Sequence, residues 1–208
     1  MHNIRWEEEP DLEAYQRLHA AVMSGLESEI ENALIDLEVL AEHGSAASMF
    51  CLAWAYSAEG AARTKDVHKS CYWYGRADQK GYATASFYYG VLCSQLHDHR
   101  EAFAAFSRGA GRDYLPAIYR LALAFREGHG TAPDIDRCRA LLERAARRGH
   151  LFARRGLAGM LIRGRYGPRQ ATRGVLMLLH LYFDAIIVFP AWCVRYGGAT
   201  LFDERVLA

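Results

Sequence analysis

Several features that mark special classes of protein are scarce or missing in this sequence. Its 208 residues include only 18 glycines and 5 prolines, too few for a collagen-like or low-complexity chain. Residues 1–10 lack the basic stretch and the apolar stretch of a secretory signal, which predicts a cytoplasmic protein. The five cysteines contain no Cys-x-x-Cys pair, so we expect reduced thiols in helix cores and neither disulfides nor a zinc site.

Motifs of catalysis and cofactor binding are missing as well. The sequence contains no Gly-x-Ser-x-Gly elbow, no phosphate-binding loop, no His-Glu-x-x-His motif and no dinucleotide fingerprint. The cluster His97-Asp98-His99 has residue types that bind metals, but Asp98 fits better as the N-cap of a helix, and no further ligand has a converging spacing. We therefore predict that the protein is not an enzyme and has no catalytic residue, cofactor or metal site.

Net charge is nearly absent, at +1, because two opposed blocks of charge cancel. Residues 1–60 hold twelve acidic residues against two arginines, whereas residues 137–173 hold eleven arginines against one acidic residue, Glu143. An asymmetry of this kind points to association with another surface rather than to a particular fold.

The chain is organised by an internal repeat. Its phase is set by Gly44, Gly81, Asp113 and Gly149, which are 37, 32 and 36 residues apart. Small or apolar residues recur two, four, eight, nine and twelve residues after each of these positions, which is a helical spacing. Each repeat therefore begins with an amphipathic helix whose small residues let a neighbouring helix approach closely.

A second helix follows in each repeat. In the first repeat it starts after Asp66, an N-cap residue, and ends before Gly81, where we expect a left-handed backbone. The second helix of the third repeat follows Asp134, and that of the second repeat starts after a shorter loop at Asp98. The phase position after the fourth repeat falls on Ala185.

This pattern resembles the Sel1-like repeat family, a relative of the tetratricopeptide repeats. The resemblance rests on a Gly-x-Ala-x-(Ala/Ser)-x-x-x-(Leu/Tyr)-(Ala/Gly) first helix, an Asp-x-x-(Lys/Arg)-(Ser/Cys) start of the second, and the glycine-containing loop at 127–130. It implies an all-α fold, a right-handed α-solenoid of stacked antiparallel helix pairs. The expected parts are N-terminal capping helices at 1–43, repeats at about 44–80, 81–112, 113–148 and 149–185, and an apolar C-terminal cap or tail at 186–208.

The resemblance also implies a binding surface, because the first helix of each pair lines the concave face in tetratricopeptide proteins. Aromatic and arginine side chains dominate the energetics of interfaces, and the implied groove is rich in both. The residues predicted to bind a partner are Phe50, Trp54, Phe87, Val91, Tyr119, Leu123, Arg126, Arg155 and Arg163. The competing interpretation is that several of the aromatic residues are ordinary core between repeats.

The arginine block is a second candidate surface, suited to bidentate contacts with anions. The residues predicted to dock on an anionic surface or partner are Arg147, Arg148, Arg154, Arg165, Arg169 and Arg173. An acidic protein surface, or the acidic N-terminal block of a second copy, is the favoured partner, and anionic lipid is an alternative. Nucleic acid is disfavoured because the block contains few aromatic residues and no nucleic-acid motif.

Residues 175–193 form an apolar stretch long enough to span a bilayer. His180, Asp184 and Pro190 argue against a membrane helix, and the repeat register assigns residues up to about 185 to the second helix of the fourth repeat. Residues 185–192 are therefore expected to pack against another surface. Three possibilities are open: the core of the cap itself, a partner or second copy, and a membrane surface.

Taken together, these patterns predict a cytoplasmic, non-enzymatic scaffold or adaptor that binds a partner protein or peptide in its concave groove. The alternative is a membrane-associated accessory or assembly factor at the inner face of a membrane. That protein would dock through the arginine block and the apolar C-terminal segment.

Overall fold

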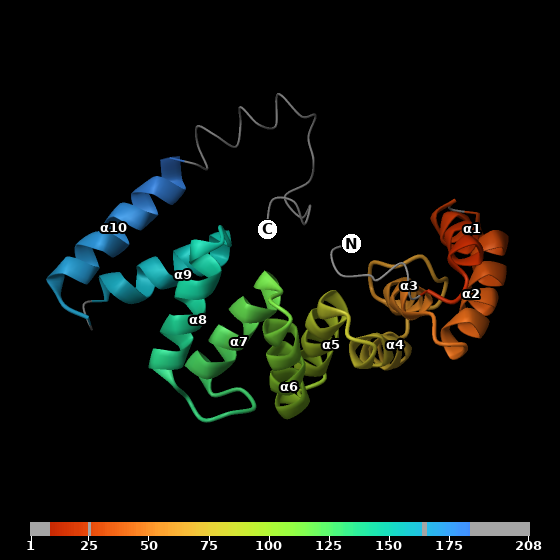
Figure 1. Cartoon of the computed structure of the whole chain (residues 1–208), viewed down its shortest axis with the longest axis horizontal. Coiled ribbons are helices and arrows are strands. Elements are labelled where there is room, and N and C mark those ends of the chain that lie inside the picture. Colours follow the sequence, from red (N-terminus) through yellow and green to blue (C-terminus); the bar gives the residue numbers. More distant parts are fainter. Residues whose placement is uncertain (1–8, 25, 164–165, 184–208) are drawn as a thin grey trace. The chain divides into compact units, whose positions relative to one another are not determined.

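The computed structural model describes residues 9–24, 26–163 and 166–183, and every regular element in that part of the chain is an α-helix (Figure 1). The ten helices of these residues are α1 (Leu12–Met23), α2 (Glu27–Glu42), α3 (Ala46–Tyr56), α4 (Val67–Gln79), α5 (Ala83–Gln95), α6 (His99–Gly111), α7 (Leu115–Glu127), α8 (Ile135–Arg147), α9 (Leu151–Ile162) and α10 (Pro168–Phe183). The predicted all-α fold is confirmed. The chain divides into two compact units between Arg112 and Asp113, so unit 1 holds α1–α6 and unit 2 holds α7–α10.

Local sequence signals begin and end these helices. The side chains of Asp66, Asp98 and Asp134 cap α4, α6 and α8, and each accepts a hydrogen bond from a backbone N–H of the first turn at 2.9–3.0 Å. Gly81 follows α4 with a left-handed φ of +97°, as predicted. Asp113 occupies the corresponding place before α7 with a φ of +64°, so the repeat imposes the left-handed backbone even on a residue with a side chain.

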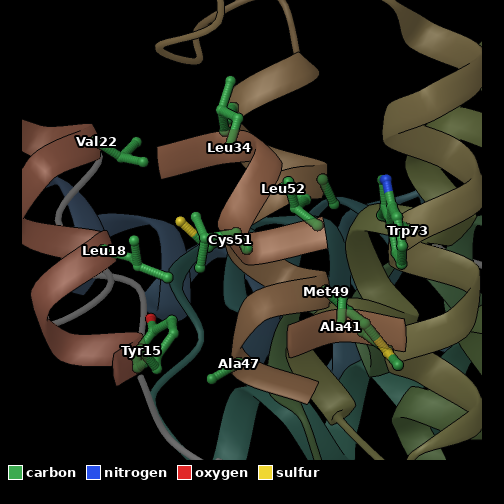
Figure 2. Close-up of a cluster of buried hydrophobic side chains, with 14 of the residues drawn as sticks. Tyr15, Leu18, Val22, Leu34, Ala41, Ala47, Met49, Cys51, Leu52 and Trp73 are labelled. Atoms are coloured by element: carbon green, nitrogen blue, oxygen red, sulfur yellow. The ribbon is translucent and has the colours of Figure 1, made fainter. Parts of the chain in front are cut away.

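The core of unit 1 combines large apolar side chains with alanines. Figure 2 shows Leu18 and Val22 pointing from α1 toward the side chains of α2 and α3. Leu37 of α2 and Leu52 of α3 are fully buried, and each such burial stabilises the fold by about 1.5–3 kcal/mol. Ala53 of α3 is also fully buried, and small residues at such places let the helices pack closely.

A buried carboxylate connects three helices of unit 1. Asp78, near the end of α4, is only 1% exposed. Its carboxylate accepts hydrogen bonds from Arg108 and Arg112, each at 2.6 Å, and from the Ser86 hydroxyl at 2.6 Å. Because a buried charge is costly unless it is paired, these partners offset the cost of burying the Asp78 carboxylate. The network thereby holds α4, α5 and the end of α6 together.

Unit 2 repeats the alternation of large and small side chains. The buried residues of α7, α8 and α9 include Ile118, Leu121, Leu142, Ala145, Leu157 and Leu161. Asp113 forms ion pairs with Arg144, at 2.6 Å, and with Arg148. The last helix differs from the others, because Gly174 is the only buried residue among those described in α10.

None of the helices in the described ranges is long and apolar enough to cross a membrane. Three sequence predictions concern residues outside those ranges. They are the docking of residues 185–192, the C-terminal cap at 186–208 and the anion contact of Arg165.

Candidate binding surfaces

In unit 1 the residues predicted to bind a partner lie on the first helices of two pairs. Phe50 and Trp54 belong to α3, Phe87 and Val91 belong to α5, and all four side chains are half-buried. Leu52, on another side of α3, is fully buried. Each helix therefore presents one side to the core and leaves a stripe of apolar side chains partly open to solvent.

Two of these residues also belong to a continuous cluster of aromatic rings. The Phe50 ring lies 5.3 Å from that of Tyr74 and 6.0 Å from that of Tyr88, and the two tyrosines stack at 5.3 Å. Phe87 meets Tyr88 edge-on at 5.2 Å. Such ring pairs contribute about 0.5–1.5 kcal/mol each, so Phe50 and Phe87 support the fold as well as the surface. Trp54 has no ring contact among the described residues, which makes it the cleaner probe of binding.

The carboxylate of Glu9 lies at the start of α3. Glu9 accepts hydrogen bonds from the backbone N–H of Ala47 at 2.9 Å, the Ser45 hydroxyl at 2.6 Å and the Tyr82 hydroxyl at 3.0 Å. The positive end of the helix dipole favours an anion at this place. No sequence pattern revealed the contact, because 36 to 73 residues separate Glu9 from its three partners.

In unit 2 the predicted residues combine apolar and cationic side chains. Tyr119 and Leu123 of α7 are half-buried, whereas Arg126, Arg155 and Arg163 are exposed. The Arg126 guanidinium forms an ion pair with the neighbouring Glu127 at 2.5 Å. Arg155 and Arg163 make no ion pair with any residue in the described part of the chain. Unit 2 therefore offers two cations to an incoming anionic group.

Tyr119 packs against a buried histidine. The ring of His150 lies 5.1 Å from that of Tyr119, and Phe152 lies 6.1 Å from both rings. His150 is the N-cap of α9, and its Nδ1 accepts the N–H of Ala153 at 3.2 Å, which requires an unprotonated Nδ1. Burial lowers the pKa of His150 to about 4, so the ring is neutral at physiological pH.

A groove of about 720 Å³ opens between α9 and α10. Its walls are apolar apart from one cation. The lining residues are Arg155 and Ile162 of α9 and Val175, Leu178, Leu179, Leu181 and Tyr182 of α10. Arg155 was predicted as a binding residue, whereas the α10 wall was recognised in the sequence only as part of a long apolar stretch.

The arginines predicted to dock on an anionic surface have different surroundings. Arg148 is engaged in its ion pair with Asp113, and Arg154 of α9 lies 3.2 Å from the Nδ1 atom of His180 on α10. Arg147, Arg169 and Arg173 are exposed. Of these, Arg169 and Arg173 share one side of α10, because residues four apart on a helix are neighbours.

The described cysteines are free thiols, three of them buried and one, Cys71, half-buried. The Sγ atom of Cys71 on α4 lies 4.0 Å from that of Cys93 on α5. The hydrogen bond from Cys93 lowers the pKa of Cys71, whereas burial raises the pKa of Cys51 to about 12. Cys71 and Cys93 are thus the one close pair of thiols among the described cysteines.

Metal binding has no support in the described ranges, where no three His, Cys, Asp or Glu side chains gather as a set of ligands. In the cluster that was considered in the sequence, Asp98 is engaged as the cap of α6 and accepts the N–H of Glu101 at 3.0 Å. The His97 and His99 rings flank it with their centres 6.1 Å apart.

The paired helices define a helical repeat protein. The family model of the Sel1 repeat matches residues 46–82 and 115–150, so the chain contains Sel1 repeats. These two segments hold α3 with α4 and α7 with α8. The resemblance stated from the sequence is thereby confirmed.

Solved structures share this fold. A Sel1 repeat protein from Oxalobacter formigenes is 20% identical, with a TM-score of 0.71, over 87% of this chain and 78% of that protein. A protective antigen of uropathogenic Escherichia coli strains, which displays an SLR fold, is 24% identical, with a TM-score of 0.71, over 88% of this chain. The chain spans 40% of the length of that antigen. None of the curated proteins matches this sequence.

Proposed function

We propose that this chain is a non-enzymatic interaction scaffold that binds a partner protein or peptide on the first helices of its pairs. The observation that carries the proposal is the stripe of half-buried apolar side chains on these helices. A large apolar side chain that is half exposed in the free protein gains stability when a partner covers it. Phe50, Trp54, Phe87 and Val91 form such a stripe in unit 1, and Tyr119 and Leu123 continue the pattern in unit 2.

The chemistry of unit 2 supports a partner that carries acidic groups. Arg155 and Arg163 are exposed, and guanidinium groups bind carboxylates through paired hydrogen bonds. Arg147, Arg169 and Arg173 add exposed positive charge to the same unit. We therefore expect the partner to present apolar side chains next to aspartate or glutamate, and its capture to weaken as salt is raised.

Quantitative affinity capture from native lysate tests this proposal, with the variants Trp54→Ala and Arg155→Ala on the first-helix surface. The matched controls are Tyr72→Ala on α4 and Arg100→Ala on α6, which remove an exposed aromatic and an exposed arginine from second helices. We expect one protein to be depleted at least about ten-fold by the first-helix variants and retained by the controls. The proposal fails if no protein is lost selectively, or if the first-helix variants unfold without changing capture by the folded fraction.

A further inference from the structure

The last described helix leaves open a face that is covered in its counterparts. The second helices α4, α8 and α10 each carry a small buried residue, which is Ser70, Cys138 and Gly174 respectively. The residue four positions later is Tyr74, Leu142 or Leu178. Tyr74 is 3% exposed and Leu142 is 1% exposed, but Leu178 is 37% exposed.

The contacts of the two buried residues show what covers them. Tyr74 stacks on Tyr88 of α5, with ring centres 5.3 Å apart. Leu142 lies under Gly156 of α9, where a β-carbon would sit 3.6 Å from either methyl group of the leucine. In each case the cover comes from the next helix along the chain, which begins after a connection of three residues.

Three neighbouring apolar side chains of α10 form a patch, which we call the open face. It consists of Leu178 and Tyr182, which are 37% and 68% exposed, and the half-buried Leu181. These side chains line the groove between α9 and α10 together with Arg155 and Ile162. An apolar patch of this kind is unfavourable in water unless something covers it.

The segment that follows α10 is apolar and could therefore cover the open face. Residues 185–194 read Ala-Ile-Ile-Val-Phe-Pro-Ala-Trp-Cys-Val, and none of them is charged. Tyr88 and Gly156, which cover the counterparts of Leu178, lie seven residues after the phase positions Gly81 and Gly149. Seven residues after the next phase position, Ala185, lies Trp192.

We infer that residues 185–194 of the same chain cover the open face of α10, with Trp192 placed over Leu178. The segment starts only two residues after the end of α10, so it reaches this face at an effective concentration in the millimolar range, about what short tethers provide. A second copy or a vesicle would have to compete with that tether. Pro190 falls in the first turn of the repeat register, where it removes one backbone donor.

Photo-cross-linking of the full-length chain tests the inference. The photoreactive residue p-benzoylphenylalanine replaces Leu178, and chains with and without ¹⁵N label are mixed before irradiation. We expect cross-links to residues 185–194, centred on Trp192, that join peptides of the same label at every protein concentration. The control position is Leu176, which lies about 200° around α10 from Leu178 and should yield at least about ten-fold less of this product.

Two outcomes of this experiment would overturn the inference in favour of another occupant. Cross-links between differently labelled chains would identify a second copy as the cover. Cross-links to lipid in phosphatidylglycerol vesicles, with none to residues 185–194 in their absence, would identify a membrane surface. A complete lack of cross-links to this segment would also reject it.

Hydrogen exchange can be measured on the chain without any substitution, so the result does not depend on whether a variant folds. We expect the backbone amides within residues 185–194 to exchange at least about ten-fold more slowly than in a free peptide of the same sequence, independently of protein concentration. Exchange at the rate of the free peptide, or protection that rises with protein concentration or appears only with vesicles, would reject the inference.

Discussion

The Nη1 atom of Arg112 lies 2.6 Å from the Oδ1 atom of Asp78, although 34 residues separate the two in sequence. Arg112 also donates from Nη2 to the backbone carbonyl of Asp78 at 3.0 Å. Arg112 follows α6 and Asp78 belongs to α4, so this pair joins the second helices of two successive helix pairs. Such a contact stabilises the stacking of repeats as well as each repeat by itself.

Replacing Asp78 by Asn should therefore destabilise unit 1. The amide would leave Arg108 and Arg112 without their shared anion in a buried place, and we expect a loss of about 3 kcal/mol, at the low end for broken buried pairs because both arginines reach solvent. Urea unfolding measures the change. Asp36→Asn, at an exposed position of α2, is the control and should change stability by less than about 0.5 kcal/mol. Equal unfolding midpoints for the two variants would show that the network contributes little.

The buried histidine of unit 2 predicts a dependence of stability on pH. His150 has a pKa of about 4 in the folded chain and about 6.5 when unfolded, so between these values the unfolded state binds more protons. Stability should thus fall as the pH drops from about 6.5 to about 4, by at most about 3 kcal/mol from this residue.

The variant His150→Asn isolates that contribution, because asparagine keeps a cap acceptor for the N–H of Ala153 and does not titrate. Thermal unfolding between pH 4 and pH 8 should show a flatter profile for the variant, together with a loss of stability that does not depend on pH, because asparagine does not replace the ring that packs on Tyr119. An unchanged slope would assign the acid sensitivity to other groups.

Two glycines of unit 2 should respond in opposite ways to alanine. A β-carbon on Gly174 would lie 2.7 Å from the carbonyl oxygen of Ala158 and 2.9 Å from Cγ1 of Ile162, so Gly174→Ala should push α10 away from α9 and cost about 1–3 kcal/mol. A β-carbon on Gly159 would meet nothing within 4 Å. Because alanine favours helix interiors, Gly159→Ala should gain up to about 1 kcal/mol. Calorimetry of both variants checks the sign, and a stabilised Gly174→Ala would mean that α10 packs differently.

The close pair of thiols should react as a pair. Diamide, an azo oxidant that removes two hydrogen atoms from two thiols, is expected to join Cys71 and Cys93, since their sulfur atoms need to move from 4.0 Å to about 2.05 Å. Peptide mapping without reductant should find this disulfide first, and Cys93→Ser should abolish it. Preferential linkage of Cys51 or Cys138 would contradict the expected order of reaction.

Most of the helical framework could be predicted from short-range patterns. Asp66 and Asp98 were identified as caps, and Gly81 as a left-handed position, because capping and backbone sterics depend on neighbours within a few residues. The hydrogen bonds of Glu9 at the start of α3 and the pairing of Asp78 with Arg112 were not predicted from the sequence. Their partners are tens of residues away, and the sequence contains no periodicity that connects them.

The candidate binding residues likewise have some properties that could be predicted from the sequence and others that could not. The resemblance to tetratricopeptide repeats, carried over through the repeat register, selected partly open positions of the first helices, including Phe50 and Trp54. That Phe50 also packs on Tyr74 and Tyr88 could be learned only from the packed structure.

By itself, the sequence of this protein determined the helices, their order and the phase of the repeat, because these depend on local sterics and on apolar spacing. Only the tertiary structure decided which charges are paired, as for Asp113 with Arg144, and which have no ion pair among the described residues, as for Arg155. It also decided that the side chain of Leu178 is open whereas that of its counterpart Leu142 is covered. The physical reason is that burial and ion pairing depend on distances in space between segments, which the order of residues along one helix does not contain.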